Sequence, residues 1–364
     1  MHVLAFENTP DNRRGGQERS FLEVTTGLVE RGHSVSLIYR TPGNLLPKYK
    51  TLCSTTVRVF HPYHLTFQHI YSQLRSILHL AGKHLSHRWD VLYTNQFHDA
   101  PFACLLAKII RRPLACHLRL PVSGYLSRQY RWALNQCDTL IPISRHTAKT
   151  YRKKGIDDKT MRVVYNGVDT THFRPQPVDE YDGRRIVYLG RITPEKGLTT
   201  LLEAFHNLTA CRDDVELRIV GGGTDIQDDD YASKLRSAAE EGPGTVVFVP
   251  HVQDVRPILS AADLLILPSE WGEPFGRVLI EAMACGIPVI GTRDGGISEV
   301  LGSEFERHIV APGAPSELAQ AIGRTIDWRD EHPELGSVMR DYVKRRFSSD
   351  QTIDHVADLL TQVA

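Results

Sequence analysis

The chain has 364 residues, with 43 Lys and Arg against 43 Asp and Glu, and 41% of its residues are hydrophobic. This length suggests two domains, and the hydrophobic share excludes a disordered chain. No apolar run approaches the roughly 18–20 residues that span a bilayer, and the six scattered cysteines show no zinc-ligand spacing. The first seven residues predict a strand rather than a signal peptide. We therefore expect a cytoplasmic protein with reduced thiols.

The balanced net charge hides an asymmetry between the two halves of the chain. Residues 1–175 carry 25 Lys and Arg against 11 Asp and Glu, whereas residues 176–364 carry 18 against 32. Opposite signs fit two domains with different partners, and the basic half favours an anionic partner such as a phosphate-bearing acceptor or a membrane surface. Attraction between the halves explains the asymmetry equally well.

Strand-like runs alternate with helix-like runs along the whole chain. The predicted strands cover residues 2–6, 34–39, 56–60, 90–94, 113–118 and 139–143, then 185–189, 215–220, 245–249, 264–267, 289–291 and 308–310. Repeated β-α units predict parallel sheets with helices on both faces. The segment 174–183, rich in Pro, Gly and charge, separates the two blocks. The fold class is therefore α/β, with two doubly wound, Rossmann-like domains that face each other across a cleft.

The helix-like run over residues 64–89 has apolar residues at helical spacing. Those on one side are Leu65, Phe67, Ile70, Leu74, Ile77 and Leu78. Such a side either packs into the core or touches a membrane. We expect it to lie in the core.

Three features of the first block are candidates for ligand binding. Gly15 and Gly16 follow the first strand and open a helix, so the backbone can approach a ligand and amides can attract an anion. An ordinary turn explains them as well. His98 and His117 follow later strands and suit hydrogen bonding or proton transfer, although a single histidine is more often structural.

Cations and glycines follow the first two strands of the second block. Arg191 and Lys196 lie in the loop after residues 185–189, where two fixed cations suit a diphosphate. The alternative is a pair of solvated surface cations. Gly222, within the three glycines at 221–223, would let the main chain approach a nucleotide.

The segment 268–288 is the most informative part of the chain. Glu273 lies in a loop, Pro274 suits a helix start, and the amides of Phe275 and Gly276 would lie at the helix N-terminus, where they can bind oxygen-rich groups. Glu281 interrupts an apolar stretch. A buried carboxylate needs a partner, such as ribose hydroxyls or an ion pair with a neighbouring strand.

Several of these motifs, in this order, match a known family. They are Glu273 and Glu281 with seven residues between them, Gly190-Arg191 with residues 195–197, the Asn-Gly-Val-Asp run at 166–169, and the Gly15-Gly16 pair. The chain resembles the retaining glycosyltransferases of family 4, which have the GT-B fold. The resemblance implies an acceptor-binding domain at 1–174, onto which a C-terminal helix at about 347–364 packs back, and a donor-binding domain at 175–346.

The resemblance also implies residue roles. Arg191 and Lys196 would bind the donor diphosphate, Glu281 the ribose, and Glu273 the donor sugar. His117 would contact that sugar near the reaction centre, with His98 as a weaker match.

The remaining donor contacts implied by the resemblance come from backbone and loops. Phe275 and Gly276 would help to hold the sugar through their amides. Gly16, beside Gly15, would approach the diphosphate from the other domain. The loop at His251 and Val252 would contact the base.

The implied reaction moves a hexose from a UDP- or GDP-linked donor to a hydroxyl of a glycan, lipid-linked or small-molecule acceptor. It proceeds with retention by front-face substitution, without a metal or a cofactor, and no nucleic acid takes part. The basic half favours a lipid-linked or phosphorylated acceptor and a peripheral contact with an anionic membrane, on its inner face. The alternatives are a non-catalytic nucleotide-sugar-binding subunit and an epimerase or phosphorylase of the same fold.

Overall fold

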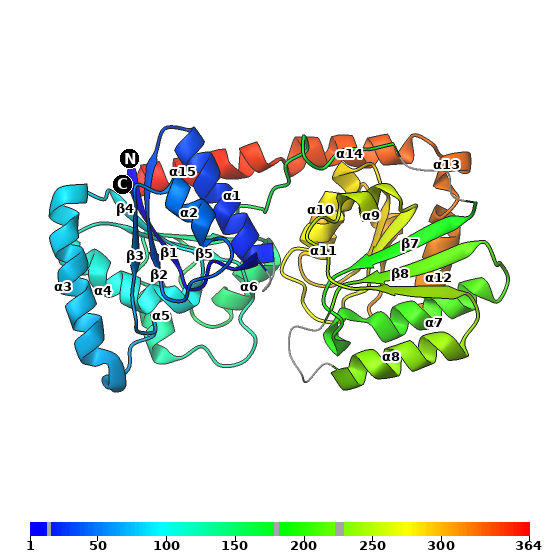
Figure 1. Cartoon of the computed structure of the whole chain (residues 1–364), viewed down its shortest axis with the longest axis horizontal. Coiled ribbons are helices and arrows are strands. Elements are labelled where there is room, and N and C mark those ends of the chain that lie inside the picture. The colour runs from blue at the N-terminus through cyan, green and yellow to red at the C-terminus, as the bar shows by residue number, and fades with distance from the viewer. Residues whose placement is uncertain (13–15, 178–181, 223–228) are drawn as a thin grey trace. The chain divides into compact units, whose positions relative to one another are not determined.

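The computed structural model describes residues 1–12, 16–177, 182–222 and 229–364. The chain divides into two compact units (Figure 1), which consist of residues 1–166 with 349–364 and of residues 167–348. Each unit contains one six-stranded parallel sheet. Within the described ranges no helix is both long and apolar enough to cross a membrane.

The first unit is built on a sheet with the strand order β3-β2-β1-β4-β5-β6. Its strands are β1 (His2–Glu7), β2 (Ser34–Tyr39), β3 (Thr55–Arg58), β4 (Val91–Thr94), β5 (Leu114–Leu118) and β6 (Thr139–Pro142). The order reverses between β1 and β4. In open parallel sheets, ligands bind beyond the carboxyl ends of the strands at such a reversal.

Two hydrophobic cores cover the two faces of this sheet, because successive strand residues point to opposite sides. In β1, Leu4 and Phe6 belong to one core, whereas Val3 and Ala5 belong to the other. Both faces are therefore covered, as expected for a parallel sheet.

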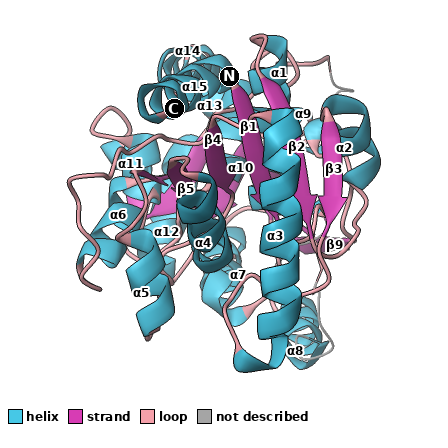
Figure 2. Cartoon of the chain, turned by 90° about the vertical axis from the view of Figure 1, so that its left-hand side faces the viewer, coloured by secondary structure: helices cyan, strands magenta, loops and turns pink. Residues whose placement is uncertain are grey.

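Helices of the first unit lie on both sides of its sheet (Figure 2). They are α1 (Gly16–Glu30), α2 (Leu46–Leu52), α3 (Ile70–His87), α4 (Ala100–Ile110), α5 (Arg128–Leu134), α6 (Arg145–Arg152) and α15 (Ser349–Val363), with short 3-10 turns η2 (Phe67–His69) and η3 (Phe97–Asp99). The last helix, α15, packs against α1. Arg31 Nε donates to Asp354 Oδ1 at 2.6 Å beside that contact.

The second unit repeats the architecture, with the order β12-β11-β10-β7-β8-β9. Its strands are β7 (Arg184–Leu189), β8 (Val215–Val220), β9 (Thr245–Val249), β10 (Leu264–Leu267), β11 (Val289–Thr292) and β12 (Ile309–Val310). Its helices are η4 (Pro194–Lys196), α7 (Leu198–Thr209), α8 (Asp229–Glu241), α9 (Arg256–Ser260), α10 (Arg277–Ala284), α11 (Ile297–Leu301), η6 (Glu306–His308), α12 (Pro315–Thr325), α13 (Trp328–Glu331) and α14 (Leu335–Arg346). The order reverses between β7 and β10.

The predicted fold class is confirmed, since every predicted strand is present with ends that differ by no more than two residues. Two local expectations are wrong. The helix expected at Pro274 begins at Arg277, because Gly276 takes a left-handed conformation (φ 84°) at its N-cap. The apolar residues of the 64–89 run do not share a buried side, since Ile77 is buried while Leu74 and Leu78 are exposed.

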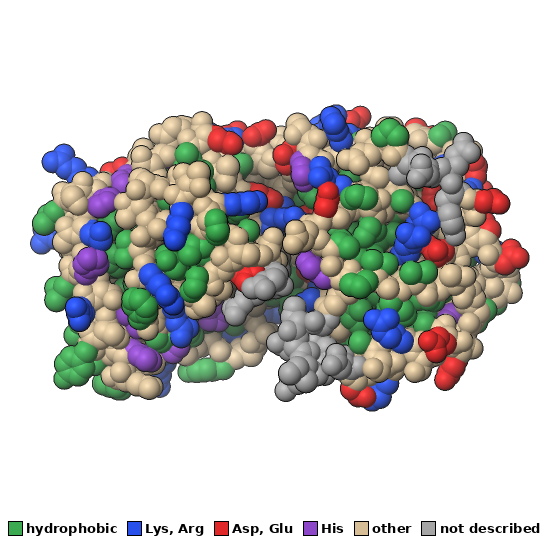
Figure 3. Space-filling view, viewed as in Figure 1, with side chains coloured by type: hydrophobic (Ala, Val, Ile, Leu, Met, Phe, Trp, Pro, Cys, Tyr) green, Lys and Arg blue, Asp and Glu red, His purple; other side chains and the backbone are tan. Residues whose placement is uncertain are grey.

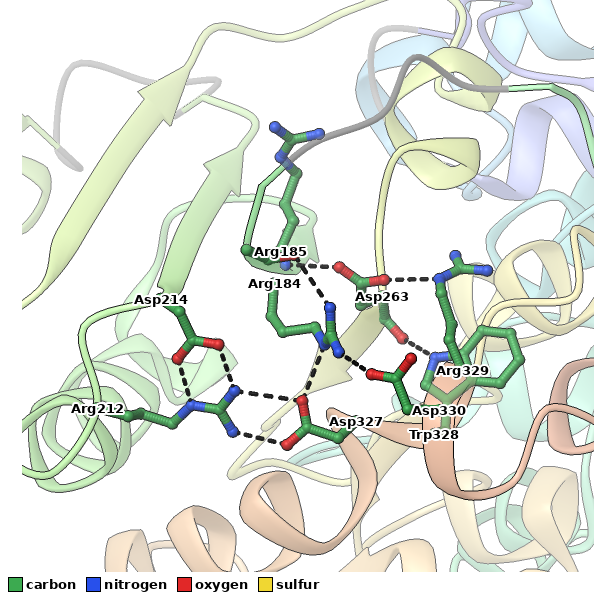
Figure 4. A network of polar contacts seen from close by, with 10 residues as sticks. Arg184, Arg185, Arg212, Asp214, Asp263, Asp327, Trp328, Arg329 and Asp330 are labelled. Atoms are coloured by element: carbon green, nitrogen blue, oxygen red, sulfur yellow. Dashed lines mark hydrogen bonds and ion pairs between the residues drawn. The ribbon is translucent and has the colours of Figure 1, made fainter.

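A network of ion pairs joins the amino ends of the strands in the second sheet to α13 (Figure 4). Asp327 accepts from Arg184 Nε at 2.9 Å and from Arg212 Nη1 at 2.9 Å. Arg212 also binds Asp214 through two hydrogen bonds of 2.6 and 2.7 Å. Asp327 thus links the first residue of β7 to a residue just before β8, at the amino ends of the strands.

We predict that Asp327→Ala lowers the free energy of unfolding of the second unit by about 1–2 kcal/mol, because two arginines lose charge-assisted hydrogen bonds. Hydrogen bonds from Arg212 are the main cause of the lowered pKa of Asp327. A lowered folded-state pKa stabilises the protein above the unfolded value of 3.8 and loses its effect as the pH falls through the folded value. Calorimetry of wild type and variant should therefore differ at pH 7 and converge in strong acid.

Asp230→Ala is the matched control, because the Asp230–Lys234 pair on α8 is largely exposed on both sides. Exposed pairs of this kind contribute only a few tenths of a kcal/mol. Equal losses of stability in the two variants would contradict the role given to Asp327.

Candidate active site

A buried ion pair lies at the carboxyl ends of β7 and β10. Lys196 ends the 3-10 turn after β7, and Glu273 lies in the loop after β10. Lys196 Nζ stands 2.6 Å from Glu273 Oε2, and the two side chains are only 11% and 14% exposed. Ser269 Oγ donates to the same oxygen at 3.3 Å, and the ammonium lies 5.2 Å from the ring centroid of Trp271. The ammonium group of Lys196 is thus fixed at the carboxyl ends of the strands, where ligands bind in open parallel sheets.

The two loops that carry this pair are joined through their backbones. Glu270 N donates to Glu195 O at 3.0 Å, and Glu270 Oε1 accepts from Thr200 Oγ1 at 2.5 Å. Gly197 has a φ of 69°, and a Cβ there would lie 2.0 Å from Pro268 O. Only glycine permits this approach, so the position of Lys196 depends on the residue after it.

Glu281 is buried on α10 and has a partner on its own helix. Arg277 Nε donates to Glu281 Oε1 at 2.8 Å, and the side chains are 11% and 6% exposed. The partner expected from the sequence was a ribose or a neighbouring strand. The ion pair is formed one helical turn away and not with a neighbouring strand, at the i,i+4 spacing that places side chains together. Ribose binding by Glu281 stays a prediction.

Arg191 lies in the same loop as Lys196 but is half exposed. Its Nη2 stands 3.7 Å from Glu195 Oε1, and Tyr188 Oη donates to the Arg191 carbonyl at 2.6 Å. The backbone of the loop is therefore held while the guanidinium remains open to solvent. The guanidinium of Arg191 is therefore accessible to an anionic ligand that enters from solvent.

Phe275 and Gly276 lie at the N-terminus of α10, as expected. Phe275 is buried and its ring meets that of Phe347 edge-on, with centroids 5.7 Å apart.

The loop after β11 holds the backbone of Glu273 through one hydrogen bond. Gly296 N donates to Glu273 O at 2.7 Å. The backbone of Glu273 is thus held by the loop between β11 and α11, while its side chain is held by Lys196.

Within the described part of the second unit, three other expected donor residues take no part in these contacts. Gly222 follows β8 with open space around its Cα. His251, exposed, and Val252, half-buried, follow β9, which is three strands away from β10. Gly16 is the exposed first residue of α1, and Gly15 lies outside the described residues.

In the first unit, His117 lies inside β5 and is buried there, so the expectation that it follows the strand is wrong. Tyr93 Oη stands 2.5 Å from its Nδ1. Burial is the main cause of a pKa well below its ordinary value, and the charge of Arg119 acts in the same direction, so the ring is neutral at pH 7. Its Nε2 is buried and has no hydrogen-bond partner among the described residues. The alternative, His98, is exposed on η3.

Beside His117, three strand ends meet in a buried polar chain. Glu7, at the end of β1, accepts from Asn95 Nδ2 at 2.6 Å, and Asn95 Oδ1 accepts from Arg119 Nε at 2.5 Å. Arg119 also donates to Asn166 Oδ1 at 3.1 Å. Burial, and next the charge of Asp99, raises the pKa of Glu7 well above its usual range. The chain occupies the point where the order of the sheet reverses.

Family models match both parts of the chain. The model for glycosyl transferases group 1 matches residues 169–345, and the model for Glycosyltransferase Family 4 matches residues 14–172. The chain belongs to the family 4 glycosyltransferases. It is therefore a transferase enzyme, as the resemblance implied.

Proteins with similar sequences are also named as glycosyltransferases or as glycogen synthases. This chain is 26% identical over 340 residues to an uncharacterized glycosyltransferase of Methanocaldococcus jannaschii, with 84% of each chain covered. It is 27% identical over 392 aligned positions to a glycogen synthase of Mycobacterium tuberculosis, with 96% of this chain and 90% of the relative covered.

Solved structures share its fold over the whole length. Anabaena Alr3699/HepE in complex with UDP has a TM-score of 0.84 at 21% identity, and a glycosyltransferase from Rickettsia africae has 0.85 at 18% identity. The first match covers 100% of both chains, and the second covers 100% of this chain and 98% of the other. At such identities the likeness shows the fold, and it confirms the GT-B architecture.

Several residues that shape the site of the glycosyltransferase were not found from the sequence. Arg277 had a signal, its i,i+4 spacing from Glu281, but that spacing is common on helix surfaces. Ser269 and Trp271 carry no such signal, because only the folded loop brings them to Glu273 and Lys196.

We predict that Arg277→Met destabilises the glycosyltransferase by about 2–4 kcal/mol, because it leaves Glu281 buried without its charged partner while it keeps the aliphatic stem. Chemical denaturation measures the loss. Lys234→Met removes an i,i+4 pair of the same kind from an exposed surface and should cost a few tenths of a kcal/mol. A loss as small in Arg277→Met would show that the buried pair contributes nothing.

Proposed function

We propose that this glycosyltransferase moves a hexose from a nucleoside diphosphate sugar to an acceptor hydroxyl, with retention of the anomeric configuration and without a metal ion. The donor base is uracil or guanine, with UDP as the first candidate, since HepE has been solved with UDP and with UDP-glucose. The acceptor is a glycan, a lipid-linked sugar or a small molecule. A peripheral contact with an anionic membrane would bring a lipid-linked acceptor to the enzyme.

The observation that carries this proposal is the buried Lys196–Glu273 pair at the carboxyl ends of β7 and β10. A poorly solvated cation attracts a phosphate oxygen more strongly than an exposed one. When a diphosphate takes over the ammonium of Lys196, the carboxylate of Glu273 becomes an acceptor for sugar hydroxyls. The same pair thus supplies one group for each half of the donor.

The transfer step needs one bond to break and one to form on the same face of the sugar. The bond between the anomeric carbon and the β-phosphate oxygen breaks, and its electron pair stays on that oxygen. The acceptor oxygen bonds to the anomeric carbon, and its proton passes to the departing phosphate oxygen. Lys196 and Arg191 stabilise the negative charge that develops there, which is the part a metal ion plays in other transferases.

Retention could also arise through a covalent intermediate, as in glycosidases with a nucleophilic carboxylate. Glu273 and Glu281 are the carboxylates that the proposal assigns to the donor, and each is engaged by a cation, Lys196 or Arg277. A paired carboxylate is a poorer nucleophile than a free one, so the front-face route fits this site better.

The first unit contributes neutral hydrogen-bonding groups to the proposal. His117 is uncharged at pH 7, so it would hold the donor sugar through Nε2 rather than act as a general acid. This role for His117 follows from the family resemblance and from the absence of a partner for Nε2 among the described residues.

We predict that UDP or GDP raises the melting temperature of the wild type. A ligand at about 100 times its Kd stabilises the folded state by about 2.7 kcal/mol, which corresponds to about 5–10 °C for a unit of this size. Glu281→Ala should reduce the shift at the same nucleotide concentration, because the ribose loses its acceptor. Differential scanning fluorimetry with UDP, GDP, ADP and NAD makes the measurement.

Glu203→Ala, on the exposed side of α7, is the control and should keep the full shift. No shift with any nucleoside diphosphate, or a shift with NAD alone, would sink the donor assignment. A shift that survives in Glu281→Ala would show that the ribose binds elsewhere.

A further inference from the structure

The exposed hydrophobic side chains of this protein are concentrated in one segment. Of the twelve large hydrophobic residues that are exposed in the described ranges, seven lie between residues 60 and 85. They are Phe60, Phe67, Ile70, Tyr71, Leu74, Leu78 and Leu85. Single exposed hydrophobic residues are normal on a protein surface, but a group of this size marks an interaction site.

Four of these residues form one stripe along α3. Tyr71, Leu74, Leu78 and Leu85 are separated by three, four and seven residues, a spacing that places them on the same side of a helix. Phe67, in the turn directly before α3, is 96% exposed. The outer side of α3 is therefore apolar along most of its length.

A second stripe holds α3 on its own unit. Gln73, Ile77 and Leu80 are buried, and Gln73 Nε2 donates to Pro62 O at 3.0 Å and to His64 O at 2.8 Å. The exposed stripe is therefore not the side by which α3 packs on its own unit. It is presented on a helix whose other side is anchored over the sheet (Figure 2).

The charges next to the stripe all have one sign. Arg75 directly follows Leu74 and borders the apolar stripe, whereas His79 and Lys83, at the next four-residue steps, turn progressively away from it. No Asp or Glu occurs between Glu30 and Asp90. In the surface view, apolar, basic and histidine side chains intermingle over α3 at the left edge (Figure 3).

We propose that this outer side of α3, together with Phe67, docks on the surface of an anionic lipid bilayer. An apolar stripe flanked by cations is the pattern of a helix that lies in the plane of a membrane interface. A second copy of the chain fits less well, because two such faces would bring Arg75 close to its equivalent. The inference rests on the proposed peripheral membrane contact and names the surface that makes it, but it does not depend on the nature of the donor.

The test is co-sedimentation of the full chain with vesicles of phosphatidylcholine alone and of phosphatidylcholine with phosphatidylglycerol. The wild type should bind the anionic vesicles, and added salt should weaken binding. Arg75→Gln should lower the partition coefficient about fivefold, the contribution of one cation near the surface. Leu74→Ser/Leu78→Ser should lower it at least tenfold.

Two control variants separate this surface from the rest of the molecule. Val338→Ser changes a residue on α14 that is 48% exposed, close to the 49% of Leu74. Lys153→Gln/Lys154→Gln removes two cations elsewhere in the same unit. Both should bind like the wild type, and melting temperatures confirm that every variant is folded.

Three results would overturn the proposal. They are equal binding to neutral and anionic vesicles or no binding to either, equal losses in the control variants, and a dimer that Leu74→Ser/Leu78→Ser dissociates in sedimentation velocity. Because the UDP-induced melting shift is measured without vesicles, failure here leaves the donor assignment standing, and failure there leaves the membrane surface standing.

Discussion

The contact between Lys196 Nζ and Glu273 Oε2, 2.6 Å long and shielded from water, is the interaction on which the donor site depends. Two charges that lose their water need each other, because the removal of one leaves the other buried and uncompensated. The pair therefore fixes two loops that come from different strands. It also keeps Lys196 and Glu273 in position before the donor binds. The donor then replaces Glu273 as the partner of Lys196, and the two loops do not have to become ordered at that step.

The parallel sheet explains why these groups can meet at all. In a doubly wound sheet the carboxyl ends of all strands lie at one edge, and the loops after β7, β10 and β11 share it. Gly197 permits the close approach of its backbone to Pro268. Gly296, in the loop after β11, donates a backbone hydrogen bond to Glu273. At the amino ends of the strands, Asp327 forms ion pairs with Arg184 and Arg212, and this network stabilises the fold. Function and stability thus occupy different edges of the same sheet.

The first unit shows the same division of the sheet with different chemistry. Its carboxyl edge holds Glu7, Asn95 and Arg119 in a buried chain, next to the neutral ring of His117. Burial favours the neutral form of both Glu7 and His117. Neutral groups that give and accept hydrogen bonds suit the recognition of sugar hydroxyls.

The sequence predicted the strands well because buried parallel strands are short apolar runs with clear ends. It also predicted the place of Lys196 and Glu273 in the loops after two strands, at the carboxyl ends where ligands bind such sheets; their roles stay a prediction. It did not predict the partner of Glu281, because the Arg277 spacing is equally common on helix surfaces. The chain from Glu7 to Asn95 was hidden, since its members lie 88 residues apart.

The outer side of α3 was predicted wrongly for a related reason. The helix has two apolar stripes, one with Ile77 and Leu80 and one with Leu74 and Leu78. Helical spacing identifies both stripes but does not say which of them faces the sheet. Only the packed structure decides that, and it leaves the larger stripe outside.

The most direct test of this account is a double-mutant cycle on the affinity for UDP alone, measured by titration calorimetry. Glu273→Gln removes the carboxylate that competes with the diphosphate for Lys196, so it should tighten UDP binding about tenfold, the equivalent of about 1.4 kcal/mol. In the Lys196→Ala background the same substitution should have no effect. Weaker or unchanged binding of UDP to Glu273→Gln would contradict the exchange of partners at Lys196.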